Sequence, residues 1–411
     1  EWGRGSTLME AHHSDVGGMH AGSMPLSAEI FQEGIIIPPL KILKKDKIDR
    51  EIVEFILANV RTPEEREGDL LAQVAANKRG IRRIEENIEK YGFETIDNYT
   101  NYLIDYTETL FKSLLIEIPQ GEYTYGDFLD DDGFSEKDIA IKVCIKVKKD
   151  KIIIDFTGSS PQVKGGVNTN DAVTYSAVLY VLTTLLAEDI PINSGIMRPV
   201  ELVLPPDSIV NASKPRGLAG GNVETSQRIV DVLLGAFAGA LPDKIPAASQ
   251  GTMNNITFGG EGFAYYETIG GGAGAGISFD GESAVHTHMT NSLNTPIEAL
   301  EIDVPVEMVN YCLRKGSGGR GKFRGGEGLC RSYKFLKDAH VSILSERRRS
   351  RPYGLTGGEP GIPGENILLK GADSAGKRRK VRLGSKVNVE IKAGDVLSIK
   401  TPGGGGYGKK E

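Results

Sequence analysis

The sequence predicts an α+β fold, a helical region followed by a β-rich C-terminal region. Residues 40–117 are dominated by Glu, Lys, Arg, Ala, Leu and Ile, which favour helices. From about residue 119 the pattern changes to short alternating apolar runs, and from residue 300 onward strand-like runs are separated by glycine-rich turns. With 411 residues the chain is long enough for two or three domains. We expect an irregular or artificially added leader over 1–10, a site loop plus helical region over 11–118, a mixed α/β core over 119–299 and a β-rich region over 300–411.

The helical region contains signals for where its helices begin and end. Thr62 is expected to cap a helix whose first position is Pro63, because proline at that position loses no hydrogen bond. Gly92 is expected to end this helix, and a second helix is expected over 96–115. A 3–4 spacing of apolar residues predicts one buried stripe on the first helix. Its members are Ile81, Ile84, Ile88 and Tyr91.

The central region alternates strands and helices. Residues 143–147 and 152–156 are apolar runs around a charged turn, which predicts a β-hairpin. Residues 171–187 and 223–241 are apolar enough to form helices that pack beneath a core.

Composition narrows the class of protein. A formal net charge of −6 argues against nucleic acid or a membrane surface as a partner, since proteins that bind these usually carry a basic excess. No apolar run approaches the length that crosses a bilayer, and no signal peptide is visible. Cys144, Cys312 and Cys330 are odd in number and widely spaced, which favours reduced thiols and a cytoplasmic location.

Glycine is abundant, with 52 residues, and one run resembles a nucleotide-binding loop. Residues 316–322 satisfy both G-x-G-x-x-G and G-x-x-x-x-G-K. However, Phe323 stands where Ser or Thr would reach Mg²⁺, and the following glycines cannot form the required helix. We therefore expect a flexible or tightly turning loop, with glycine permitting close backbone approach.

Five of the six histidines fall in two groups, which is the strongest functional signal in the sequence. The first group combines His12, His13 and His20 with Asp15 and two glycines. Imidazole and carboxylate groups at this density are typical of a metal or acid/base site. If residues 12–15 are extended, His13 and Asp15 share one face while His12 points to the other. Two converging ligands are only part of a site, so the remainder must come from elsewhere in the chain.

The second group supplies His286 and His288, which would also share a face in a strand. The alternative interpretation, that these histidines only form structural hydrogen bonds near a turn, remains open for both groups.

Residues 220–228 combine glycine and polar residues at an expected helix start. Asn222 or Thr225 is a candidate N-cap, and Glu224 would favour the positive helix end. Alternatively, this helix start faces a carboxylate or amide ligand, with Gln227 and Arg228 as donors.

Ser249 lies in a run of small and amide residues, without the surroundings of an activated nucleophile. We interpret it as a turn residue that bonds the backbone.

Six motifs in order resemble the hydantoinase B/oxoprolinase family from about residue 11 to 408. They are AHHSDVGG over 11–18, IFQEG over 30–34, LANVRTPEER over 57–66, GNVETSQR over 221–228, HTHMTN over 286–291 and PGGGGYG over 402–408.

The resemblance implies the B-type subunit of an ATP-dependent enzyme that opens a cyclic amide or imide of the 5-oxoproline or hydantoin class. It implies that a separate A-type subunit binds ATP, in a hetero-oligomer. The mechanism it implies is phosphorylation of a carbonyl-type oxygen, after which metal-activated water or an enolate attacks. It further implies that His12, His13 and Asp15 form a metal or acid/base group, with a divalent metal such as Mn, Zn or Mg. Glu224, His286 and His288 are then candidates for the wall of the same cavity.

The chain departs from the family pattern at its start, where relatives carry a further segment with a His-Leu-Pro-Asp-like motif. We therefore expect the site to be composite, near the place where such a segment would meet His286 and His288. Two other functions remain open: a subunit of an ATP-dependent ketone carboxylase, and a structural subunit without chemistry of its own.

Overall fold

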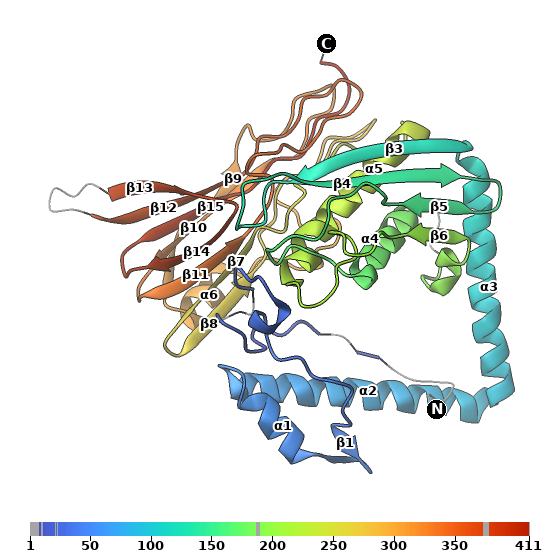
Figure 1. Ribbon diagram of the computed structural model, residues 1–411, viewed down its shortest axis with the longest axis horizontal. Helices are drawn as coiled ribbons and strands as arrows, with labels where there is room; N and C mark the ends of the chain where they lie inside the picture. The colour runs from blue at the N-terminus through green and yellow to red at the C-terminus, as the bar shows by residue number, and fades with distance from the viewer. Residues whose placement is uncertain are drawn as a thin grey trace.

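The computed structural model describes residues 8–9, 11–20, 22, 24–185, 190–372 and 378–410 (Figure 1). The expected leader over 1–10 therefore lies almost entirely outside the described residues. The α+β class is confirmed: long helices dominate the first part of the chain, and strands dominate the last part. None of the helices in the described part of the chain is long and apolar enough to cross a bilayer.

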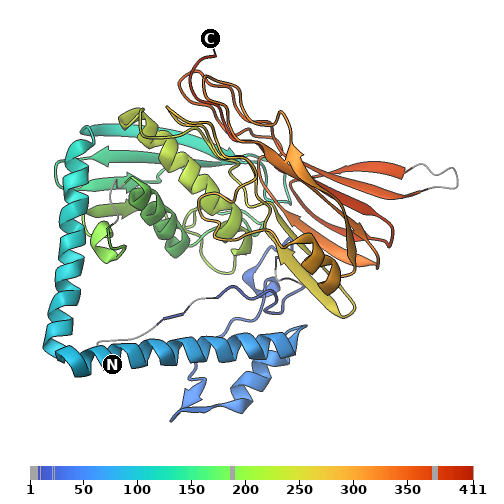
Figure 2. The same ribbon diagram turned by 180° about the vertical axis from the view of Figure 1, so that it is seen from behind.

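Three helices form an arm at one side of the molecule. They are α1 (Arg50–Leu57), α2 (Pro63–Tyr91) and α3 (Phe93–Glu117), preceded by a small hairpin of β1 (Leu43–Lys44) and β2 (Lys47–Ile48). Figures 1 and 2 show α2 and α3 meeting at a corner, with α2 lying away from the sheets. The start of α2 at Pro63 is confirmed, as is its end at Gly92, where φ is +82°.

The predicted buried stripe on α2 is wrong. Ile81 and Tyr91 are 44% and 51% exposed, and Ile84 and Ile88 are only half-buried. The 3–4 spacing does form an apolar face on α2, but this helix extends beyond the body of the protein, so no sheet covers that face.

The first core lies between a four-stranded sheet and two helices. The strands are β3 (Gly121–Leu129), β4 (Ile139–Val147), β5 (Ile152–Asp155) and β6 (Val200–Val203), in that order, with only the β5–β6 pair parallel. The predicted hairpin is confirmed as the antiparallel β4–β5 pair. The helices are α4 (Asp171–Thr184) and α5 (Ser226–Ala240). Apolar side chains from the sheet and both helices form one continuous cluster, and nearly all of α5 is buried.

The second core lies between two antiparallel sheets. One has the order β14-β11-β7-β8 and the other β13-β12-β15-β10-β9. Their strands are β7 (Asn255–Gly260), β8 (Phe263–Glu267), β9 (Val306–Arg314), β10 (Gly328–Phe335), β11 (Ala339–Leu344), β12 (Glu365–Ala372), β13 (Arg378–Leu383), β14 (Lys386–Ile391) and β15 (Val396–Lys400). Phe258 of β7 contacts Tyr333 and Phe335 of β10, with ring centroids 5.9 and 5.2 Å apart. A short helix, α6 (Ile297–Asp303), precedes β9.

Glycine-rich segments connect the two cores and pack closely against one another, which we call the glycine layer. Its segments are 246–251, 270–276, 317–326, 352–361 and 402–408. Gly319 N donates to Gly404 O at 2.8 Å, and Gly404 N donates to Gly326 O at 2.9 Å. A Cβ added to Gly404 would overlap the carbonyl oxygen of Ala273.

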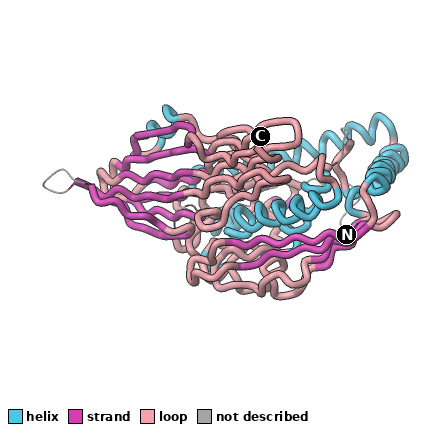
Figure 3. Tube along the Cα trace, turned by 90° about the horizontal axis from the view of Figure 1, so that it is seen from above, coloured by secondary structure: helices cyan, strands magenta, loops and turns pink. Residues whose placement is uncertain are grey.

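The expectation of tightly turning loops is confirmed in part: the chain turns at Gly316 and Gly357, where φ is +79° and +91°, whereas most of these segments are extended and mutually hydrogen-bonded (Figure 3). The expectation of close backbone approach is confirmed. No helix follows residues 316–322, so they lack the helix start that a nucleotide loop requires.

Candidate functional site

The start of α5 is irregular, and this irregularity positions Glu224. Residues Gly221–Thr225 form a single π turn, a feature that often marks functional sites. The capping prediction is not confirmed: neither Asn222 nor Thr225 makes a side-chain cap, and the Thr225 hydroxyl donates instead to the carbonyl of Val167. The π turn leaves the Glu224 side chain fully buried between the helix and the following strand segment.

Glu224 is held through only one of its two oxygens. Oε1 accepts from Met253 N at 3.0 Å and from Asn255 Nδ2 at 2.7 Å. Oε2 is buried and has no hydrogen-bond partner among the described residues. Burial, together with the nearby Glu346 carboxylate, raises the pKa of Glu224 to about 8, although the Thr252 hydroxyl, Lys386 and the Met253 N–H oppose this shift. At neutral pH this side chain is therefore mainly a carboxylic acid that can donate a proton.

His288 lies beside α5 in a left-handed conformation, with φ at +55°. Its Nδ1 is 3.4 Å from the Tyr180 hydroxyl, and its Nε2 is 4.0 Å from Asp231 Oδ1. Burial lowers the pKa of His288, although the Asp231 carboxylate opposes this shift. The imidazole is thus neutral at pH 7 and able to accept a proton.

Gln227 fixes the histidine loop to α5. Its Nε2 donates to Thr287 O and Thr290 Oγ1, each at 2.9 Å. We refer to Glu224, Gln227, Asp231 and His288 as the polar centre.

Buried ion pairs surround the polar centre. Arg347 Nη2 is 2.6 Å from Asp231 Oδ2 and 2.8 Å from Asp127 Oδ2, so only Oδ1 of Asp231 is left to face His288. Arg228, expected as a possible ligand donor, donates instead to the carbonyl of Phe128. Arg228 also lies 3.6 Å from Asp127 Oδ2 and 3.6 Å from Glu346 Oε2, so both buried guanidinium groups face carboxylates, as burial requires.

The two histidines of the second group do not share a face. His286 Nδ1 is 3.5 Å from Thr268 Oγ1, whereas His288 faces Tyr180 and Asp231. The expectation of a shared face assumed a strand, but these residues form a loop that turns at His288. Burial lowers the pKa of His286 as well.

The first histidine group is also split. His13 lies against α2, with Nε2 2.6 Å from Gln73 Nε2 and Nδ1 3.5 Å from Asp69 Oδ2. Asp15 is fully buried, accepts from Gly17 N at 2.7 Å and lies 3.2 Å from Arg61.

His12 is exposed, so the three predicted ligands face different surroundings. Within the described residues no group of three or more His, Cys, Asp or Glu side chains is arranged to hold a metal ion. The arrangement of His12, His13 and Asp15 does not fit a metal as it stands, and metal binding stays a prediction.

Glu33 joins the loop after the first histidine group to the start of α5, and the residue pattern alone did not single it out. Its Oε2 accepts from Leu218 N at 3.0 Å and Ala219 N at 3.1 Å, while Ser27 donates to Oε1 at 2.6 Å. Leu218 and Ala219 immediately precede the π turn that carries Glu224. The loop that follows the first histidine group is therefore anchored at the start of α5. The one feature of the sequence that could have indicated Glu33 is its position in the IFQEG motif.

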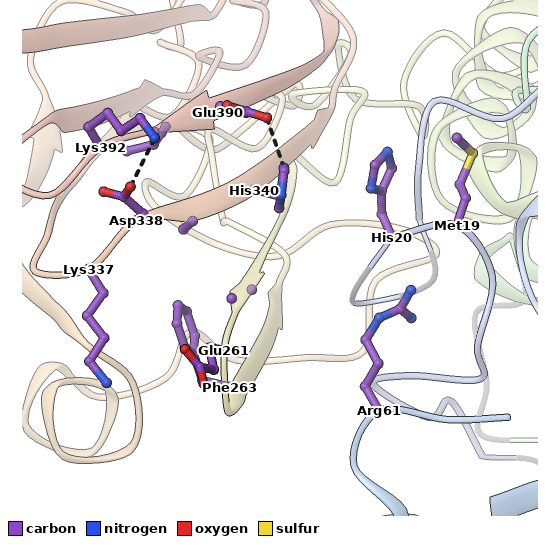
Figure 4. A pocket seen from close by; sticks show the side chains of 14 residues that line it. Met19, His20, Arg61, Glu261, Phe263, Lys337, Asp338, His340, Glu390 and Lys392 are labelled. Atoms are coloured by element: carbon purple, nitrogen blue, oxygen red, sulfur yellow. Dashed lines mark hydrogen bonds and ion pairs between the residues drawn. The ribbon is translucent and has the colours of Figure 1, made fainter. Parts of the chain in front are cut away.

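An open cleft of about 1190 Å³ lies between this loop and the β7–β8 and β11–β14 strands. Figure 4 shows Met19, His20 and Arg61 on one side and Lys337, His340, Glu390 and Lys392 on the other. The rings of His20 and His340 lie 6.1 Å apart. His340 is the one histidine outside the two sequence groups, so the spacing gave no signal for it.

Comparisons with known proteins agree with this architecture. The family model for hydantoinase B/oxoprolinase matches residues 4–410. An uncharacterized protein of Methanocaldococcus jannaschii is 41% identical over 98% of this chain, which spans 70% of that relative. The 5-oxoprolinase of Dictyostelium discoideum is 40% identical over 97% of this chain, which spans only 31% of that protein.

Among solved structures, the ATP-dependent caprolactamase of Pseudomonas jessenii superimposes with a TM-score of 0.88 at 26% identity. The match covers 97% of this chain and 71% of the caprolactamase chain. These matches confirm the resemblance predicted from the six motifs, and the chain belongs to the hydantoinase B/oxoprolinase family.

Proposed function

We propose that this chain is the B-type half of an ATP-dependent enzyme that hydrolyses a cyclic amide or imide of the 5-oxoproline or hydantoin class. The relatives named 5-oxoprolinase and ATP-dependent caprolactamase support this choice, because both names describe action on lactams. ATP would bind to an A-type partner or an equivalent region outside this chain. Residues 316–322 pack closely against other backbone segments of the glycine layer and no helix follows them in the described part of the chain, which supports the binding of ATP outside this chain.

The observation that carries the proposal is the fully buried Glu224, whose pKa is raised to about 8. A lactam carbonyl is a poor electrophile because of amide resonance, and phosphorylation of its oxygen removes that resonance. Water can then attack the carbon, the C–N bond breaks, and the ring nitrogen needs a proton to leave. A protonated Glu224 supplies that proton through Oε2, the oxygen that has no partner among the described residues. The acyl phosphate that remains is hydrolysed by a second water to a carboxylate and inorganic phosphate.

His288 is the proposed base that takes the proton of the attacking water. Its neutral imidazole is oriented by Tyr180 and lies opposite Asp231, which stabilises the imidazolium once it forms. Loop 286–290 contacts Gln227 and Asp231 of the polar centre. Because Glu224 is buried and His288 is largely buried, substrate entry requires a movement that exposes them. Gln227, which joins the loop to α5, is then a positioning residue.

The test is an assay of ATP-dependent phosphate release by this chain co-purified with an A-type partner. 5-Oxoproline, hydantoin and caprolactam are compared with acetone plus bicarbonate. We expect release with a cyclic amide, a loss of about 10²-fold or more in Glu224→Gln and His288→Gln, and near wild-type rates in the control Ser249→Ala.

Stimulation by acetone plus bicarbonate alone would establish the carboxylase alternative. Full activity of Glu224→Gln with a cyclic amide would refute the assigned role of Glu224. No stimulation by any substrate would favour the structural alternative.

The proposal includes a hetero-oligomer with the A-type partner and a cytoplasmic location, the latter supported by the sparse cysteines. No step above passes through a metal ion.

A further inference from the structure

Two of the three cysteines, although widely spaced in the sequence, lie on neighbouring strands of one sheet. Cys312 on β9 is directly opposite Cys330 on the antiparallel strand β10. Both are free thiols, and Cys312 is exposed while Cys330 is half-buried. Directly opposed residues of antiparallel strands have Cβ atoms about 4.5–5.5 Å apart, close to the separation that a disulfide spans.

The two thiols also interact. Burial raises the pKa of Cys330, and the neighbouring Cys312 thiol raises that pKa further. Segment 315–327, which belongs in part to the glycine layer, returns the chain from β9 to β10 and creates this pairing.

The same sheet face carries positive charge. Lys400 of β15 is the direct partner of Cys330 on its other side, and Arg314 follows Cys312 by two residues, so side-chain alternation places both on the cysteine face. Glu365 pairs with both cations, at 3.3 Å from Arg314 and 3.7 Å from Lys400. Two cations against one carboxylate leave a positive surface beside the thiols, which attracts an anionic reagent.

We propose that Cys312 and Cys330 form a dithiol site for exchange with a small anionic disulfide such as glutathione disulfide. The exposed Cys312 thiolate attacks one sulfur of the reagent, forms a mixed disulfide and releases one glutathione thiolate. Cys330 then attacks Cys312 Sγ, forms the cross-strand disulfide and releases the second glutathione. The two protons lost by the protein thiols end on the two glutathione thiols, so the protein is oxidised and the reagent reduced.

The product would join the edge strand β9 covalently to β10 and close the loop between them. Among the strands that the structure describes, β9 is the last of its sheet and has one neighbour, β10. A cross-link would prevent that edge from separating. No residue of the polar centre belongs to β9 or β10, so the inference does not depend on the proposed function.

The test uses the full chain, reduced and then incubated with glutathione disulfide. Free thiols are counted by maleimide labelling and mass spectrometry, and peptides are mapped without reduction. We expect two of the three thiols to be lost, a Cys312–Cys330 peptide to appear, and dithiothreitol to restore both thiols. Cys144→Ser, the matched control, should give the same cross-link.

The single variants separate the two steps. Cys330→Ser should trap glutathione on Cys312, and Cys312→Ser should yield no internal disulfide. Circular dichroism of each variant establishes that it is folded. The inference is overturned if the folded wild-type chain yields no Cys312–Cys330 peptide, or if Cys330→Ser traps no glutathione at Cys312.

Discussion

The replacement Glu224→Gln tests the most unusual group in the protein. The amide has nearly the shape of the carboxyl, and its oxygen can still accept from Met253 N and Asn255 Nδ2. What changes is that the side chain can no longer ionise. The variant therefore isolates the energetic effect of burying an ionisable group from the effect of packing.

The expected magnitude follows from the pKa. The pKa of Glu224 is about 8 in the folded state, against an ordinary value of 4.5. At about 1.4 kcal/mol per pKa unit, this shift changes the free energy of unfolding by at most about 5 kcal/mol between low and high pH. Because the pKa is raised, the contribution of the protonated Glu224 to the free energy of unfolding is complete below pH 4.5, where Glu224 is protonated in both the folded and the unfolded chain. It is lost progressively as the pH rises to 8, because the unfolded chain releases the proton and the folded chain does not.

The assay is urea denaturation of wild type and variant from pH 4.5 to pH 9. The difference between their free energies of unfolding should be small at pH 4.5 and should grow in favour of Glu224→Gln up to about pH 8. Other titrating groups are common to both proteins and cancel in the difference. Glu261→Gln, at an exposed position in the cleft, is the matched control and should show no comparable trend. A difference that does not vary with pH would refute the burial argument.

Four further substitutions have defined outcomes. Gly404→Ala should lower the free energy of unfolding in the same urea assay by about 1–3 kcal/mol, because the added Cβ overlaps a carbonyl oxygen. Gly68→Ala, which adds a Cβ in open space on α2, should raise it by about 0.5–1 kcal/mol. Arg61→Lys should weaken the contacts to buried Asp15 and to the carbonyl of Gly18 by about 1–3 kcal/mol. The expected result is faster protease cleavage within residues 11–20, and an unchanged rate would contradict this. Burial lowers the pKa of His288, so the unfolded chain binds a proton at this residue at a higher pH than the folded chain does. The free energy of unfolding of wild type should therefore fall relative to that of His288→Gln as the pH drops from 6.5 to the lowered pKa. Parallel pH profiles of the two proteins would contradict this.

The sequence was most informative where structure is determined locally. The start of α2 at Pro63 and its end at Gly92 follow from backbone chemistry within a few residues, and both are confirmed. The apolar face of α2 was also visible, but its burial was not, because burial depends on whether another element covers that face. The glycine runs likewise showed that backbones could approach closely. They did not show which segments would meet, because each partner comes from a distant part of the chain.

The same distinction explains why the candidate site was only partly predictable. Short spacing suggested that His13 and Asp15, and likewise His286 and His288, would share faces. One residue in a left-handed conformation was enough to direct His286 and His288 to different surroundings. By contrast, the contact that joins the histidine loop to α5 links Gln227 to Thr287, 60 positions apart, and no periodicity reports such a pair. Residue types at a motif can thus indicate the kind of chemistry, whereas the partners that tune it, such as Glu346 for Glu224 and Asp231 for His288, are set by long-range packing.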